Sequence, residues 1–146
     1  MVMADNRQAY RQSFVSKLEQ LGINYQFNNK AILCFEWKTG KSYRFPCEMI
    51  FVDNRLSFKV KVISLLTETI FPDAYYYCGV LNNKINWLKV FIDKHRAVFC
   101  MVETELNADD VIDECTELLR RMENAVVLIQ DVFQELLKLS RGENNE

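Results

Sequence analysis

The sequence predicts a single α+β domain in which helices pack on an antiparallel sheet of about five strands, in the order α-β-β-β-α-β-β-α. Three observations predict this class. A long segment near the C-terminus has the apolar spacing of an amphipathic helix, two groups of short segments alternate like strands, and short turn signals join the strands within each group. The chain has 146 residues, 49% hydrophobic and 26% charged, as expected for one globular domain over residues 1–146.

The first predicted element is a helix over residues 5–21. Tyr10, Phe14, Leu18 and Leu21 share one face at helical spacing. Gly22 follows the last of them, in the position where glycine often ends a helix.

Residues 25–63 change to the pattern of strands. An apolar segment at residues 31–37 is followed by a turn signal at residues 38–40, and residues 42–52 then alternate between apolar and polar side chains. Pro46 marks an edge position or a bulge, because proline cannot donate to a strand ladder. After a turn at residues 53–55, residues 56–62 alternate cleanly. Because the turns are short, we expect a three-stranded antiparallel meander.

Residues 64–72 have no clear period and are expected to cross an edge of the sheet as a loop. Asp73 can cap a short helix that runs to residue 86, although Gly79 within it is unfavourable for a helix. Residues 88–93 and 97–105 are predicted to be two strands, joined by a tight turn at Lys94, His95 and Arg96.

A long helix is predicted over residues 107–140, with Asn107 as its N-cap and an acidic first turn that suits the helix dipole. A helix of about 32 residues measures ~48 Å, whereas a compact domain of this size has a radius of gyration of only ~15 Å. We therefore expect the helix either to bend near residues 123–124 or to overhang the sheet and pack on a second chain. The apolar residues of that overhang include Ile129, Val132, Phe133 and Leu136.

The last two predicted strands are apolar on both faces. Val90 is opposed by Phe91 in the first, and Val98, Cys100 and Val102 are opposed by Phe99 and Met101 in the second. One row faces the protein's own helices, and the other needs a cover. A symmetry-related copy is the commonest cover, so Phe91, Phe99 and Met101 are candidate interface residues.

Composition argues against several classes of partner and location. A net charge of −2 gives no general attraction to nucleic acid or to an anionic membrane. No apolar run approaches the roughly 20 residues that cross a bilayer, and residues 1–7 lack the pattern of a secretory signal. Five widely spaced cysteines without a C-x-x-C pair indicate reduced thiols in a cytoplasmic protein.

No catalytic, metal or cofactor motif is apparent. His95 is the only histidine, so a Ser-His or Cys-His arrangement would have to use it, and its place in a basic turn indicates exposure to solvent. The acidic residues at 109–117 lack the glycine turn of a calcium loop. Glycine-rich phosphate-binding loops are absent. We therefore expect no metal, no cofactor and no enzymatic activity.

Basic residues on the polar side of the predicted meander admit two interpretations. Arg44, Lys59 and Lys61 could form a patch for an acidic partner. Alternatively, Glu36 and Glu48 neutralise them and the face is simply solvated.

Residues 81–93 resemble the YbjN-like family. The resemblance lies in the pair Leu81-Asn82, a second asparagine at Asn86, and a short strand that ends in Phe91-x-Asp93. The following strand, which ends at Leu106, and the long helix with an acidic start are also similar to that family. Its members are labelled bacterial sensory transduction regulators and share the type III secretion chaperone-like fold.

The resemblance implies an α/β sandwich that dimerises and handles other proteins, with no catalytic residues to carry over. We interpret Asn82, Asn86 and Asp93 as structural. Asparagines four residues apart share a helix face, Asn86 suits the left-handed end of a helix, and Asn82 can bond nearby backbone. Gly79 and the basic turn at residues 94–96 depart from the family pattern.

The leading hypothesis is a cytoplasmic, non-enzymatic homodimer that binds an unidentified protein, as a chaperone-like or regulatory module. The alternative is a small-ligand sensor with an apolar pocket between sheet and helices, lined by Phe, Tyr and Met side chains. A hydrolase that uses His95 and a cysteine is the third hypothesis and the least supported.

Overall fold

The computed structural model describes residues 7–38, 44–66, 71–106 and 111–140. Three helices and six strands follow one another in these ranges. They are α1 (Arg7–Gln20), β1 (Tyr25–Phe27), β2 (Leu33–Lys38), β3 (Arg44–Val52), β4 (Arg55–Ile63), α2 (Phe71–Lys84), β5 (Lys89–Ile92), β6 (Val98–Glu105) and α3 (Val111–Ser140). The predicted α+β class and element order are confirmed, with one additional strand.

The six strands form one antiparallel sheet in the order β1-β2-β3-β4-β6-β5. The meander predicted for β2, β3 and β4 is confirmed, and β6 pairs with β4 along its whole length. The sheet has six strands rather than five because Tyr25, Gln26 and Phe27 pair with β2 as an edge strand. Three residues are too few for an alternation to be recognised in the sequence.

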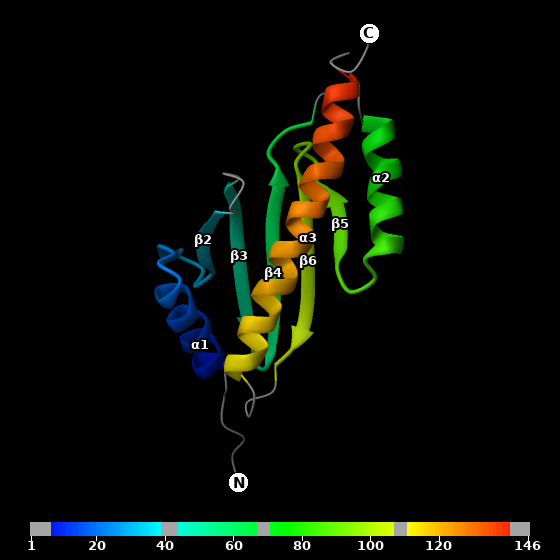
Figure 1. Ribbon diagram of the computed structural model, residues 1–146. Coiled ribbons are helices and arrows are strands. Elements are labelled where there is room, and N and C mark those ends of the chain that lie inside the picture. The colour runs from blue at the N-terminus through cyan, green and yellow to red at the C-terminus, as the bar shows by residue number, and fades with distance from the viewer. Residues whose placement is uncertain (1–6, 39–43, 67–70, 107–110, 141–146) are drawn as a thin grey trace.

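The helices cover one face of the sheet, and α3 runs diagonally across β4 and β6 (Figure 1). Its first half lies beside α1 and its second half beside α2, which also contacts β5. Between helices and sheet lies one continuous core, and its largest fully buried side chains come from α1, strands β2, β3 and β4, the segment after β4, and α3. They are Tyr10, Phe14, Phe58, Phe133, Leu18, Leu33, Met49, Leu56, Leu66, Met122 and Ile129.

The second half of α3 does not overhang the sheet, so the second of the two predicted alternatives is wrong. Ile129 and Phe133 are 0% exposed, Leu136 is 6% exposed, and Val132 is partly buried against the same core. The comparison of the helix length with the radius of gyration of a compact domain was misleading, because the sheet is elongated along its strands and α2 flanks the end of α3 (Figure 1). Ile129, Phe133 and Leu136 are therefore covered by their own chain, and Val132 is partly covered by it.

Smaller differences concern the ends of elements. Gly22 ends α1 with a φ of 71°, and the N–H of Ile23 donates to the carbonyl of Leu18, as expected for a glycine cap. Leu21, expected on the buried face, is 52% exposed because it lies beyond the last helical turn. The helix predicted at residues 73–86 spans Phe71–Lys84. The proposed N-cap Asn107 and the acidic residues at 109–110 lie outside the described residues.

Candidate protein-binding surface

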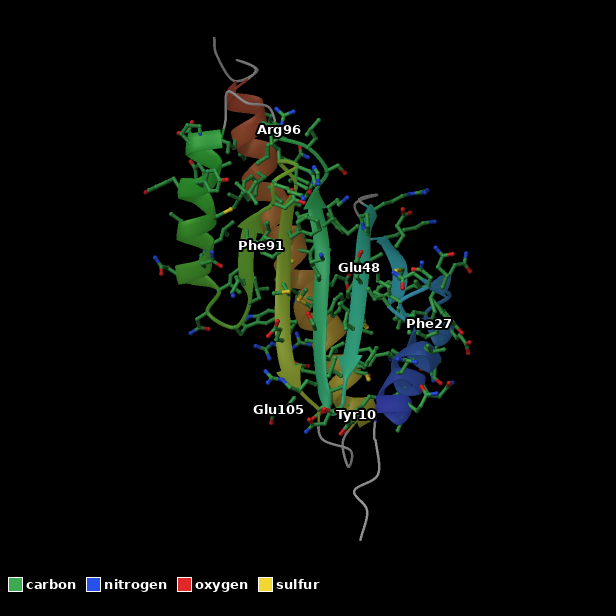
Figure 2. All side chains as sticks on the ribbon, turned by 180° about the vertical axis from the view of Figure 1, so that it is seen from behind. Tyr10, Phe27, Glu48, Phe91, Arg96 and Glu105 are labelled. Atoms are coloured by element: carbon green, nitrogen blue, oxygen red, sulfur yellow. The ribbon has the colours of Figure 1, made fainter. Side chains whose placement is uncertain are left out.

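The face of the sheet opposite the helices, which we call the outer face, carries the second apolar row of the β5–β6 hairpin. Phe91 faces Phe99 and Lys89 faces Met101 across the two strands. The alternating residues Val90, Val98 and Cys100 are buried on the helix side, whereas Phe91, Phe99 and Met101 are only half-buried. In the part of the chain that the structure describes, no helix lies on this face (Figure 2).

Phe99 has a neighbour on each side of its ring. The rings of Phe91 and Phe99 are stacked, with centroids 5.5 Å apart and an interplanar angle of 17°. On the β4 side, the Nζ atom of Lys59 lies 4.9 Å and that of Lys61 5.8 Å from the centroid of the Phe99 ring, within the range of cation–π contacts. The outer face therefore presents an aromatic pair bordered by two ammonium groups.

Carboxylates partly neutralise the basic side chains of the outer face. Lys59 lies 3.6 Å from Glu48 and Arg44 lies 3.5 Å from Glu36, and all four side chains are at least 36% exposed. Exposed pairs of this kind contribute little to stability. They do reduce the net positive charge of the meander, which argues against a continuous basic patch there.

Along the strands of the outer face the charge changes sign. Lys61 faces Phe99, Lys59 faces Met101, and Ser57 faces Glu103, so the three rows run from basic to acidic. Glu103 is exposed and Lys61 is half-buried. Sequence reasoning had singled out Lys59 and Lys61 but not Glu103, whose position opposite β4 depends on the β4–β6 register.

A groove of about 490 Å³ lies beside the start of β5, and we call it the hairpin groove. It exists because β6 extends beyond β5: β6 pairs with β4 from Val98 to Glu105 but with β5 only as far as Met101. The turn that follows α2 occupies the remaining space incompletely. The groove is lined by Asn82, Asn86, Trp87, Leu88, Lys89, Met101, Val102 and Glu103.

Asn82 and Asp93 both form hydrogen bonds with nearby backbone groups. Asn82 Nδ2 donates to the carbonyl of Val90 at 2.8 Å, and the N–H of Val90 donates to Asn82 Oδ1 at 2.6 Å. Asp93 Oδ1 accepts the N–H groups of His95 and Ala97 at 2.9 and 3.0 Å. These bonds lower the pKa of the Asp93 carboxyl, the bond from Ala97 most of all.

The conformation expected of Asn86 is wrong. The described non-glycine residues with positive φ are Ala31, Asp53 and Arg96, and Asn86 is not among them. It lies exposed in the turn after α2, because the helix ends earlier, at Lys84.

A second groove, of about 780 Å³, lies on the helix side between the end of α1, β2 and α3. Its apolar lining comes from Leu21, Ile23, Trp37 and Leu119. Trp37 is its one aromatic side chain, and the groove contains neither phenylalanine nor methionine. It is therefore unlike the aromatic pocket that the sensor hypothesis predicts.

The chemically reactive side chains are dispersed. His95 is exposed in the β5–β6 turn. Burial raises the pKa of the Cys78 thiol to about 11. The pKa values of the Cys100 and Cys115 thiols are raised to about 12, and burial is the largest cause. Within residues 7–38, 44–66, 71–106 and 111–140, no group of three or more His, Cys, Asp or Glu side chains is placed to hold a metal. None of the described helices has the length and apolar character to span a membrane.

No protein-family model matches the chain, and neither does any curated protein. Among solved structures it is similar to YbjN of E. coli, a proposed transcription regulator, with a TM-score of 0.63 at 12% sequence identity, over 88% of this chain and 91% of that one. The chain has a YbjN-like fold. It also matches SycH, a type III secretion chaperone of Yersinia pestis in complex with a stable fragment of YscM2, with a TM-score of 0.49, 16% identity and coverage of 82% and 98%.

Proposed function

We propose that this protein is a non-enzymatic protein-binding module, chaperone-like or regulatory, that acts as a homodimer in the cytoplasm. The observation that carries the proposal is the stacked pair Phe91 and Phe99 on a sheet face that no described helix covers. Half-exposed aromatic side chains bordered by charged ones are typical of the centre of a protein interface. The YbjN-like fold is consistent with a regulatory role.

The positions of the reactive groups support a role other than catalysis. An imidazole can act as a general base only where it reaches a nucleophile. His95 lies on an exposed turn, and the cysteines other than Cys34 are buried. High thiol pKa values keep buried cysteines in the unreactive protonated form at neutral pH.

Two surfaces of the chain suit two kinds of partner. The outer face is broad and is the candidate for the second copy. The helix-side groove combines the apolar Leu21, Ile23 and Trp37 with charged side chains and is open to solvent. Because the groove is open rather than closed, it favours a protein segment over an enclosed small ligand.

Sedimentation velocity of the full chain at 10 to 100 μM tests the homodimer. We expect a species of twice the 17.2 kDa chain mass. The double variant F91S/F99T should sediment as a monomer, because aromatic side chains are the contacts whose loss most weakens an interface. L128S removes an exposed apolar side chain from α3 and is the matched control that should remain dimeric. A wild-type monomer throughout this range would contradict the homodimer.

Affinity capture from the native cell tests the partner. Wild type and L128S should recover the same proteins. L21S/I23S, which removes two exposed or half-exposed apolar side chains from the helix-side groove, should lose them. If the groove variant recovers the same proteins as wild type, this groove is not the partner site.

A further inference from the structure

We infer that the outer face binds a second copy of this chain about a two-fold axis that runs across the strands, along the row Lys59, Met101 and Lys89. This inference rests on the proposed homodimer and specifies its geometry. In this arrangement Phe99 of each copy lies over Glu103, at the outer rim of the other copy's hairpin groove, and Lys61 of each copy lies beside that same Glu103.

The register of the sheet places the aromatic pair and the rim of the hairpin groove at equal distances from this row. Lys89 faces Met101, and two residues further along β5 and β6 lie Phe91 and Phe99. Two residues in the opposite direction along β6 lies Glu103, which lines the hairpin groove. Trp87 also lines this groove, but it precedes β5 and the centroid of its ring lies 4.3 Å from the guanidinium carbon of Arg121 on α3, toward the helix side. A two-fold axis through the Lys89–Met101 pair therefore places Phe99 of each copy over Glu103, at the outer rim of the other copy's groove, as an isologous interface requires.

The same axis makes the charges complementary. Lys61 lies level with Phe99 on the neighbouring strand, and Ser57 lies level with Glu103. Lys59 lies midway between Lys61 and Ser57 on β4, so rotation about the row that contains Lys59 places Lys61 of one copy over Ser57 of the other. Projected onto the sheet, Lys61 is then offset by one strand spacing, ~4.8 Å, from that copy's Glu103, and the two side chains reach toward each other across the ~10 Å between the sheets. The pairing occurs twice by symmetry.

The lysines on the axis do not oppose this arrangement strongly. Lys59 has Glu48 as a counter-ion at 3.6 Å. Lys89 is exposed on the edge strand, where a flexible ammonium group can turn to solvent.

A two-fold axis parallel to the strands is less favourable. An axis along β6 would place the two Glu103 side chains opposite each other and Lys59 of one copy opposite Lys89 of the other. The axis across the strands also brings Lys59 onto Lys59 and Lys89 onto Lys89, but it avoids the Glu103–Glu103 repulsion and adds two Lys61–Glu103 attractions, which selects it over the parallel axis.

The size of the face is sufficient for a stable dimer. Strands ~4.8 Å apart and residues ~3.4 Å apart along each strand give a face of about 25 by 28 Å, or roughly 700 Å² per copy. Two copies would bury about 1,400 Å² in total, within the standard range for specific interfaces.

Charge reversal at the two positions tests this geometry by sedimentation equilibrium in 50 mM salt. Lys61→Glu alone and Glu103→Lys alone should each weaken dimerisation on the order of tenfold or more, because each replaces two attractive contacts with two repulsive ones. The double variant K61E/E103K restores both contacts and should return to within about threefold of wild type. An equimolar mixture of the two single variants should form a heterodimer, since its two contacts are again between opposite charges.

Controls separate this geometry from the homodimer itself. K138E reverses an exposed charge on α3, where Lys138 lies 3.7 Å from Glu135, and should dimerise like wild type. Circular dichroism verifies that each variant is folded. Single variants that dimerise as tightly as wild type would overturn the axis and leave the homodimer intact, and so would a double variant that fails to recover. A monomeric wild type would remove both.

Discussion

Replacing Asn82 with alanine tests whether its side chain closes the free edge of the sheet. Asn82 donates to the carbonyl of Val90 at 2.8 Å and accepts the N–H of Val90 at 2.6 Å, so the variant leaves both backbone groups without that partner. Each lost bond to a partly buried group costs about 1 kcal/mol when water can approach from one side. The expected loss is therefore about 2 kcal/mol, which lowers the melting temperature by about 6 °C in a domain of this size.

Asn83 provides the matched control, because it is exposed on the same helix. Alanine raises helix propensity to the same extent at either position, so the difference between N82A and N83A isolates the two hydrogen bonds. Urea unfolding gives the free energies, and hydrogen exchange should show faster exchange of the Val90 amide in N82A. Substitutions at surface sites usually change the free energy of unfolding by no more than ~0.5 kcal/mol. If the free energies of unfolding of N82A and N83A differ by less than about that amount, the proposed role of Asn82 is refuted.

Three further predictions concern other parts of the molecule. The pKa of Asp93 is lowered in the folded protein, so its stabilising effect should be present above about pH 4 and be lost as the pH falls through the folded-state pKa below that value. D93N should remove this pH dependence in urea unfolding measured from pH 7 downward. F133A should cost about 3–5 kcal/mol, because the ring is 0% exposed, whereas L128A on the exposed side of α3 should cost less than about 1 kcal/mol. With a disulfide reagent at pH 8, Cys34 should react first and the four buried thiols only on unfolding, since Cys34 alone is half-exposed.

Elements with a long apolar period were predictable from the sequence, and their ends and the shortest strand were not. The four-three spacing of α3 and the alternation of β3 and β4 each extend over many residues, so tertiary contacts did not override them. β1 has only three residues, which is too short for an apolar pattern to predict that it pairs with β2. Asn86 was misassigned because its conformation depends on where α2 ends, which local sequence determines only to within a few residues.

Part of the candidate surface was predictable for the same reason. Two-sided apolar alternation in the hairpin identified Phe91, Phe99 and Met101 before any pairing was known. The hairpin groove could not be predicted, because it results from the difference in length between β5 and β6. Glu103 became a candidate only once its register with Ser57 was known.

The error about α3 changes which surface a partner can use. Had the helix overhung the sheet, its apolar row would have offered a groove for a second helix, and the outer face would have been one of two candidates. Because Ile129 and Phe133 are fully buried, the accessible ones among the apolar interface residues predicted from the sequence are mainly Phe91, Phe99 and Met101 of the β5–β6 hairpin. An interface through those residues must bring two sheets together face to face, about 10 Å apart. At that separation the positions of Lys61 and Glu103 decide which orientations are compatible, so the charge-reversal variants report on geometry and not merely on association.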